Sequence, residues 1–323
     1  MDALRRIAET VLYEGHVLWP YRRSALKNRE RWTFGRLHPL SHQSPGDATS
    51  LQAQVILEAE PPAHVDVAVR FLQSVKRRVR RDGEEVDGIE IDGRSVLAWD
   101  EATEREIVLP AVALGGAPRR HVFDVEAGSS EEPLCETGGA RMGTLARDWP
   151  ALSGELEVST EPIGAAAWRV TVRVTNTTAV VVSGLATTFL SAHVVLHVEG
   201  GEWVSMTDSP PDLADAVAAC RNVGVWPVLV GELGDRTTLL AAPIVLYDYP
   251  QIAPESFGDF FDATEIDEML VLNVLALTDD ERREMAASDP RARAIVERCA
   301  AMSADDFMRL HGVLRDVRAV GEA

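Results

Sequence analysis

A stretch of alternating apolar and polar residues that begins near Leu51 most constrains the fold. In HVDVAVRFLQSVKRRV, apolar side chains recur at alternate positions, namely Val65, Val67, Val69, Phe71, Val75 and Val79. Successive side chains of a strand point to opposite faces of a sheet. The period of two therefore predicts a long strand with one buried face.

Turn signals and further alternating segments follow this strand. Asp-Gly pairs begin at Asp82, Asp87 and Asp92, and Asp-Gly is favoured in two-residue hairpin turns because it accepts positive φ. GELEVSTEPI, WRVTVRVTNTT, SAHVVLHVEGGEW and LLAAPIVLY have strand character. Several short strands separated by turn signals predict an antiparallel sandwich or a barrel-like sheet. We expect residues 129–150 to form a long loop and MLVLNVLAL, residues 269–277, to form a strand.

Helices are predicted at both ends of the chain. Ala3, Leu4, Ile7, Val11 and Leu12 lie near a period of 3.6 and predict a helix over residues 2–13. Near the C-terminus, Thr278 with Glu281 predicts a capping box, and Asp289 before Pro290 and Ser303 before two aspartates predict two further helix starts. Three helices follow, over residues 279–288, 290–302 and 304–317. A further helix is expected over residues 213–224, with Pro211 near its start and Gly224 at its end.

These elements predict an α+β protein with a large antiparallel, sandwich-like β core. We divide the chain into a helical basic N-terminal arm (residues 1–50), a β-rich segment (51–150), a β-sandwich-like core (151–277) and a helical C-terminal cap (278–323). The core contains an acidic segment over residues 247–268.

Composition narrows the classes of function. The chain has 323 residues and a formal net charge of −19, although basic residues outnumber acidic ones up to Arg81. A protein with this negative net charge is expected to repel nucleic acid and anionic membranes. The three cysteines lie far apart, which favours a reducing cytoplasm and excludes a Cys-x-x-Cys site. We expect a cytoplasmic protein with no cofactor.

The acidic segment YDYPQIAPESFGDFFDATEIDE, residues 247–268, is the predicted functional region. It holds seven carboxylates and no Lys, Arg or His, together with three phenylalanines and two tyrosines. Three interpretations stay open: a hard-cation site, an internal clamp with the basic stretch at residues 22–31, and a surface for a partner protein. The candidate partner-binding residues are Asp248, Tyr249, Glu255, Phe260, Phe261, Asp262, Glu265, Glu268, Arg22, Arg23, Lys27 and Arg29.

Two histidines have spacing that resembles a metal pair. His193 and His197 would share a helix face and could hold zinc there. The intervening Val-Val-Leu instead predicts a strand, in which these imidazoles would lie roughly 13 Å apart. We therefore predict no metal site from this pair, and we predict no metal ligand or catalytic residue elsewhere in the chain.

Three blocks of the chain resemble a known family. LYEGHVLWPYRRSALKNRERWTFGRLHP, APIVLYDYPQIAPES with FDATEIDEML, and SDPRARAIVERCAAMSADDFMRLHG are similar to a family of uncharacterised, mostly actinobacterial proteins. The genes of that family accompany those of actinobacterial-type nickel–iron hydrogenases. The resemblance implies an accessory or assembly role and carries over no catalytic residues.

The expected function is that of a non-enzymatic accessory protein that binds a hydrogenase subunit or a maturation factor. The first alternative is a divalent-cation-dependent hydrolase or lyase that uses Asp248, Glu255, Asp262 and Glu265. The second is a module that binds a small ligand.

Overall fold

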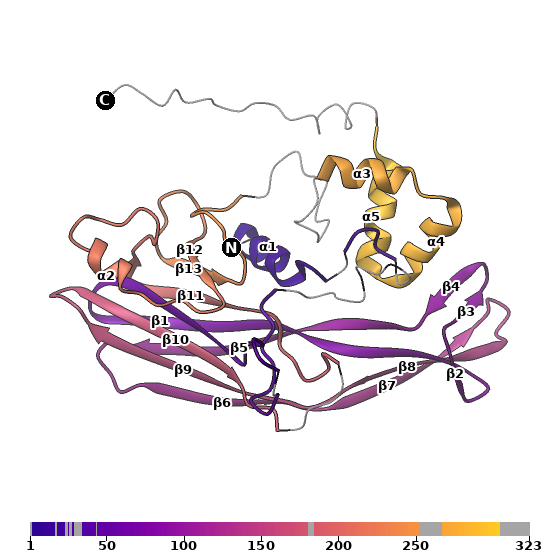
Figure 1. Ribbon diagram of the computed structural model, residues 1–323, viewed down its shortest axis with the longest axis horizontal. Coiled ribbons are helices and arrows are strands. Elements are labelled where there is room, and N and C mark those ends of the chain that lie inside the picture. Colours follow the sequence, from indigo (N-terminus) through magenta and orange to yellow (C-terminus); the bar gives the residue numbers. More distant parts are fainter. Residues whose placement is uncertain are drawn as a thin grey trace.

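The computed structural model describes residues 2–16, 18–22, 25, 28, 34–42, 44–179, 184–251 and 267–303, and their side chains except those of residues 2–6, 267 and 268. Within these ranges, eleven strands form one antiparallel sheet, and β3 and β4 pair separately. The helices lie on one side of the sheet (Figure 1). The predicted α+β class with a sandwich-like antiparallel core is confirmed.

The strands are β1 (Ser50–Arg81), β2 (Glu84–Val86), β3 (Gly88–Ile91), β4 (Arg94–Leu97), β5 (Trp99–Ala113), β6 (Arg119–Val125), β7 (Gly128–Cys135), β8 (Arg141–Trp149), β9 (Leu152–Pro162), β10 (Ala167–Asn176), β11 (Leu190–Trp203), β12 (Trp226–Leu229) and β13 (Thr238–Ala242).

The long strand β1 organises the sheet. One of its edges pairs with β11, and the other pairs with β10 over its first third and with β5 from His64 onward. The register with β11 shifts between Ala59 and His64, where Pro61 and Pro62 supply no N–H donors to the ladder. β1 therefore has neighbouring strands along both of its edges. In the strand order β12-β13-β11-β1-β10-β9-β6, strands that are far apart in sequence lie side by side.

The main core lies between the facing parts of this curled sheet. Alternate residues of β1 point inward, as the period of two predicts, and meet inward residues of β9, β10 and β11. The buried rings of Phe71 and Phe189 stack with centroids 4.3 Å apart. The inward valines and leucines are Val65, Val67, Val69, Leu152, Leu156, Val158, Val170, Val172, Val174, Val194, Leu196 and Val198.

Two of the three predicted Asp-Gly turns close hairpins. Asp82 and Gly83 join β1 to β2, Asp92 and Gly93 join β3 to β4, and all four residues have positive φ. The third pair is different, because Gly88 already belongs to β3. A Cβ at that position would lie 2.8 Å from the carbonyl oxygen of Val96.

The predicted long loop at residues 129–150 is wrong. This region forms the hairpin of β7 and β8, paired from Gly128 with Trp149 to Cys135 with Arg141. Most of β7 is exposed and only Leu134 is buried, so no apolar alternation marks it as a strand. Backbone pairing with β8 and ion pairs such as that of Glu131 with Arg80 hold it in place.

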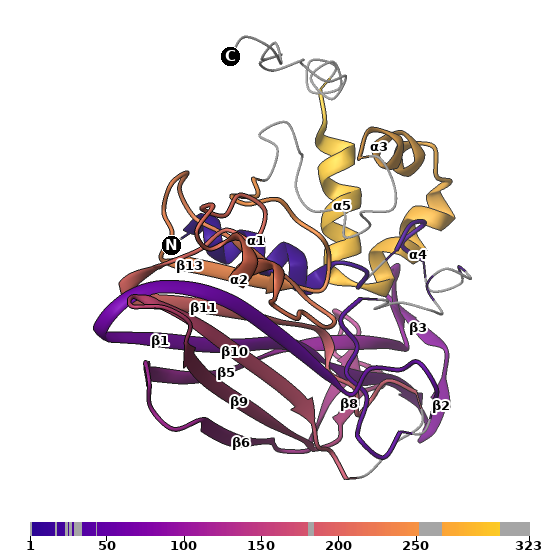
Figure 2. The same ribbon diagram turned by 60° about the vertical axis from the view of Figure 1, so that its left-hand side comes forward.

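Helix α1 (Asp2–Tyr13) confirms the N-terminal prediction. Its residues Ile7 and Val11 pack on the outer face of β12 and β13 against Val228, Val230 and Leu240. Both faces of β13 are therefore buried, which explains its continuous apolar sequence. Figure 2 shows α1 lying across this part of the sheet. Helix α2 (Ala214–Ala218) is shorter than predicted and buries Val217.

The predicted strand at residues 269–277 is also wrong. This segment forms α3 (Asp267–Leu275), with Leu270, Val271 and Val274 buried on one face. Met269, Leu272 and Leu275 are partly exposed on the other. Apolar residues on both faces hide the helical period, so a short apolar run of this kind is ambiguous in sequence.

Two of the predicted C-terminal helices are confirmed with their caps. α4 (Asp279–Ser288) begins with the capping box of Thr278 and Glu281, and α5 (Pro290–Ala301) begins at the N-cap Asp289. With α3 they enclose a second core around Met285, Ile295 and Cys299. The third predicted helix, residues 304–317, lies outside the described residues. None of the helices in the described ranges has the length and apolar character needed to cross a membrane.

Candidate functional site

The structure describes only part of the predicted partner-binding set. Asp248, Tyr249 and Arg22 are described, and Glu268 lies in the first turn of α3 with its side chain outside the description. The remaining candidates lie outside the described residues: Arg23, Lys27, Arg29, Glu255, Phe260, Phe261, Asp262 and Glu265.

Asp248 organises the loops at the end of β12. Its Oδ2 accepts hydrogen bonds from the hydroxyls of Ser205 at 2.5 Å and Thr207 at 3.2 Å. Its Oδ1 accepts a hydrogen bond from the backbone N–H of Leu229 at 2.8 Å. Both carboxylate oxygens are thus used within the chain, which favours a positioning role over cation binding.

Tyr249 continues the same arrangement. Its backbone N–H donates to the carbonyl of Leu229 at 2.7 Å, and its φ of 54° lies in the left-handed region. The ring packs against the main core, and its phenol hydrogen-bonds the backbone of Gly234. Tyr249 therefore joins the segment after β13 to the loop between β12 and β13.

Three exposed apolar side chains flank this junction. Tyr247 is 87% exposed, Leu233 85% and Val245 79%, the highest values among the large apolar side chains in the described parts of the chain. Leu233 precedes the glycine that Tyr249 contacts, and Tyr247 precedes Asp248. We call Leu233, Val245 and Tyr247 the apolar loop surface.

Arg22 does not contact the described part of the acidic segment. Its Nη1 lies 2.8 Å from Oε1 of Glu281 in α4. This ion pair links the N-terminal arm to the C-terminal cap. Among the described residues, the internal clamp between residues 22–31 and the acidic segment therefore gains no contact from Arg22.

His193 and His197 lie on β11, as the strand prediction requires. His193 is fully buried and its Nδ1 lies 2.9 Å from the carbonyl oxygen of Ser191. His197 is exposed and its Nδ1 lies 3.1 Å from the hydroxyl of Thr238. The two imidazoles thus have separate partners.

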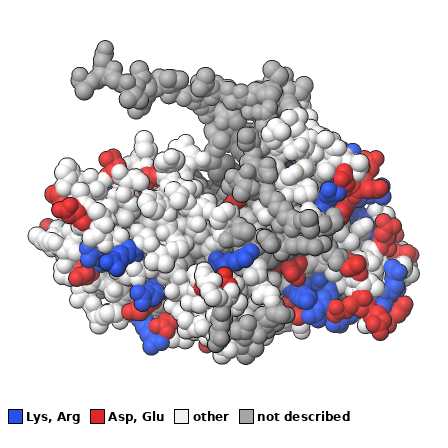
Figure 3. All heavy atoms as spheres, viewed as in Figure 1, with Lys and Arg blue, Asp and Glu red and all other residues white. Residues whose placement is uncertain are grey.

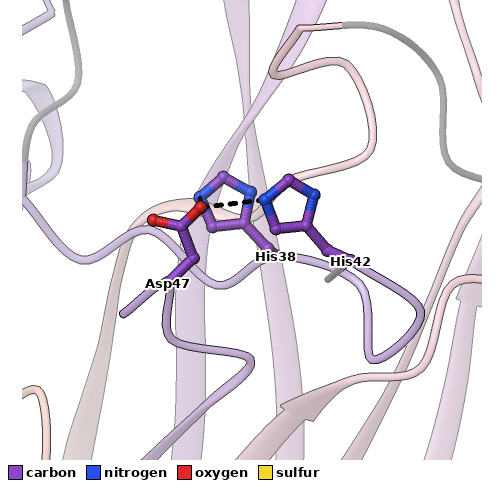
Figure 4. Close-up of side chains that lie close together, drawn as sticks. All are labelled: His38, His42 and Asp47. Carbon is purple, nitrogen blue, oxygen red and sulfur yellow. Dashed lines mark hydrogen bonds and ion pairs between the residues drawn. The ribbon is translucent and has the colours of Figure 1, made fainter. Parts of the chain in front are cut away.

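A second group of potential ligands lies in the loop before β1, within the predicted N-terminal arm. His38, His42 and Asp47 place one ligand atom each within 4.8 Å of the others. Nε2 of His42 lies 2.8 Å from Oδ2 of Asp47, and Nε2 of His38 lies 4.0 Å from the same oxygen. The two imidazoles stack, with ring centroids 4.4 Å apart (Figure 4).

Backbone contacts explain why these three residues meet. Leu37 pairs with Phe189, which anchors the loop to the sheet, and the N–H of His38 donates to the carbonyl of Ala48 at 2.8 Å. The N–H of His42 donates to the carbonyl of Pro39, closing a turn that folds the second ring over the first. The sequence signal was a His-x-x-x-His pair with an aspartate five residues further on.

No protein-family model matches the chain, and none of the curated proteins gives a significant match.

Proposed function

We propose that this protein acts as a non-enzymatic accessory protein and binds a protein partner through the apolar loop surface of Leu233, Val245 and Tyr247. The observation that carries this proposal is the exposure of these side chains, 79–87% in each case. Single exposed apolar residues are common on soluble proteins. Here three of them lie on two loops that Tyr249 joins, and tyrosine is enriched among residues that dominate binding energy.

The loops are held in a defined conformation. The three hydrogen bonds accepted by Asp248 and the two contacts of Tyr249 fix the chain immediately after Tyr247. A surface that is ordered before binding loses less conformational entropy when a partner docks. Asp248 and Tyr249, predicted as contact residues, support binding in this proposal mainly by positioning their neighbours.

Charge supports a basic partner. The surface over β12 and β13 is largely uncharged, whereas charged side chains gather at the opposite end around β3, β4 and α4 (Figure 3). The whole chain carries a formal charge of −19, so its field attracts a positively charged partner and raises the rate of encounter. The apolar loop surface then provides the short-range contact.

The resemblance to the hydrogenase-associated family supplies the class of partner. We propose a hydrogenase subunit or a hydrogenase maturation factor, in agreement with the role that the resemblance implies. The alternative of a carboxylate-based hydrolase or lyase has less support, because both oxygens of Asp248 already accept hydrogen bonds.

The test is affinity purification of the tagged protein from its native host, with mass spectrometry of the proteins that co-elute. We expect hydrogenase subunits or maturation proteins, in smaller amounts at high salt. Tyr247→Ser and Leu233→Ser should each abolish their recovery. Val122→Ser is the matched control, since Val122 is 59% exposed on β6, away from the two loops.

A direct binding assay with the purified partner then separates specific contact from co-purification. Equal recovery with wild type, Tyr247→Ser and Val122→Ser would exclude the apolar loop surface as the contact. Recovery of the tagged protein alone would contradict the accessory role itself. Both conclusions require that the variants have the same melting temperature as wild type.

A further inference from the structure

The ligand atoms of His38, His42 and Asp47 are spaced as a first-row transition metal requires. Zinc bonds of about 2.0–2.2 Å place tetrahedral ligand atoms about 3.4 Å apart. The two measured separations from Oδ2 of Asp47, 2.8 Å to His42 and 4.0 Å to His38, fall on either side of that value. The two rings must rotate when an ion binds, because they lie nearly parallel, at 15° to each other, and each nitrogen lone pair lies in the plane of its ring.

The hydrogen-bond partner of His38 determines which of its ring nitrogens faces Asp47. Nδ1 lies 3.2 Å from the hydroxyl of Thr188, which is 1% exposed. Nε2 is the nitrogen on the side of Asp47. A histidine ligand characteristically has its second nitrogen hydrogen-bonded, because that contact sets the tautomer and orients the ring. Thr188 meets this requirement from the segment just before β11.

Access is open on one side, since His38 is buried, His42 is half-buried and Asp47 is exposed.

We propose that His38, His42 and Asp47 form a binding site for a divalent first-row transition metal, with Zn²⁺ the best-matched ion. Two imidazoles and one carboxylate are a donor set that zinc accepts. The exposed side of the site leaves a further coordination position for water or for a group from another molecule. The site is independent of the apolar loop surface.

The experiment is a titration of the full-length, chelator-treated protein with ZnCl₂, carrying no polyhistidine tag. Competition with a chromophoric chelator and isothermal calorimetry measure the affinity and the number of ions. We expect one tightly bound equivalent. His42→Gln and Asp47→Asn should each weaken binding about 100-fold, and Thr188→Val about tenfold, because it removes only the contact that orients His38.

His64→Gln is the matched control, since His64 is an exposed histidine on β1 outside the loop. It should leave affinity and stoichiometry unchanged. Circular dichroism and melting curves of the metal-free variants establish that each is folded. Because His42 and Asp47 are not buried, their variants are expected to fold even if His38→Gln does not.

Two results would overturn the proposal. Wild-type affinity weaker than about 100 μM would show that the stacked rings and the His42–Asp47 contact are only a surface arrangement. Tight binding that survives both His42→Gln and Asp47→Asn would place the ion elsewhere. Neither result bears on partner binding, which Tyr247→Ser tests separately.

Discussion

Nε2 of His16 lies 3.0 Å from Oδ2 of Asp289, and the two side chains are 1% and 3% exposed. They join the end of α1 to the N-cap of α5 across 273 positions of sequence. Asp289 also accepts a hydrogen bond from the backbone N–H of Arg291. Burial alone would raise the pKa of Asp289, but the hydrogen bond and charge of His16 outweigh it and lower the pKa to about 2.

Breaking this pair should destabilise the protein strongly. Removing one partner of a buried ion pair leaves an uncompensated polar group and costs about 3–5 kcal/mol. We expect Asp289→Asn and His16→Asn each to lower the free energy of unfolding by about 3 kcal/mol, measured by urea denaturation. The double variant should lose less than the sum of the two, since the residues share one contact.

The control for that pair is Asp280→Asn. Asp280 and Arg283 form an exposed ion pair on α4, at 86% and 63% exposure. Exposed pairs contribute about 0–1 kcal/mol, so this variant should change stability little. Equal losses from Asp289→Asn and Asp280→Asn would show that burial does not determine the effect.

Arg77 should be a second point of attachment for the C-terminal helices. This buried side chain of β1 donates to the carbonyls of Ala287 and Ser288 at the end of α4, and to Leu97 and Glu101. It satisfies carbonyls that the helix leaves without partners and places positive charge at the C-terminus of the helix. We expect Arg77→Met to lower the unfolding free energy by about 3 kcal/mol.

The neighbouring Arg78 provides the comparison for Arg77. It is 30% exposed and pairs with Glu85 and Asp148, so Arg78→Met should cost about 1 kcal/mol or less. Hydrogen exchange should show faster opening of α4 and α5 in Arg77→Met, with the sheet unchanged. A uniform loss of protection over the whole chain would argue against a local anchoring role.

His193 should make stability depend on pH between about 6.5 and 4. Burial lowers its pKa to about 4, the carbonyl of Ser191 opposes the shift, and the charge of Arg70 adds to it. Below pH 6.5 the unfolded chain binds a proton at this histidine that the folded protein does not bind. The contribution of this histidine to stability is therefore complete above pH 6.5. It is lost as the pH drops to 4, which lowers the free energy of unfolding by about 3 kcal/mol.

The check is the unfolding free energy of wild type and His193→Leu at several pH values. The difference between them should shift by about 3 kcal/mol over this window, because the variant lacks the titrating group. His64→Leu removes an exposed histidine and should leave the pH profile parallel to that of wild type. Parallel profiles for His193→Leu would contradict the assignment.

The three cysteines should react at different rates. Cys135 is exposed, whereas Cys220 is half-buried and Cys299 is buried. Burial raises the pKa of Cys220, and raises that of Cys299 to about 11. Since the thiolate is the reactive form, a disulfide reagent should modify one thiol quickly in the native protein and all three after denaturation. Cys135→Ser should remove the fast phase.

Sequence patterns correctly predicted the elements whose stabilising contacts join residues close together in the chain. The capping box at Thr278 and the N-cap at Asp289 satisfy neighbouring backbone groups, and both are present. The alternation around Val67 predicted β1 because the pleat of a strand imposes that period on any half-buried segment. The same reasoning placed His193 and His197 on a strand.

The predictions were wrong for elements that do not have apolar residues on one face only. α3 carries apolar residues on both faces, and β7 is mostly exposed, so neither shows the period that identifies its type. In each case neighbours distant in sequence determine the structure, since α3 packs against α5 and β7 pairs with β8.

The amino-acid sequence by itself determined the strands with alternating burial, the capped helices and the acidic balance of the chain. The tertiary structure alone decided which polar groups meet. Asp248 reaches Ser205, His16 reaches Asp289, and Thr188 reaches His38 across 150 positions. Such contacts depend on the path of β1 through the sheet and on the packing of the helices, and no local period or spacing encodes the distance between two distant side chains.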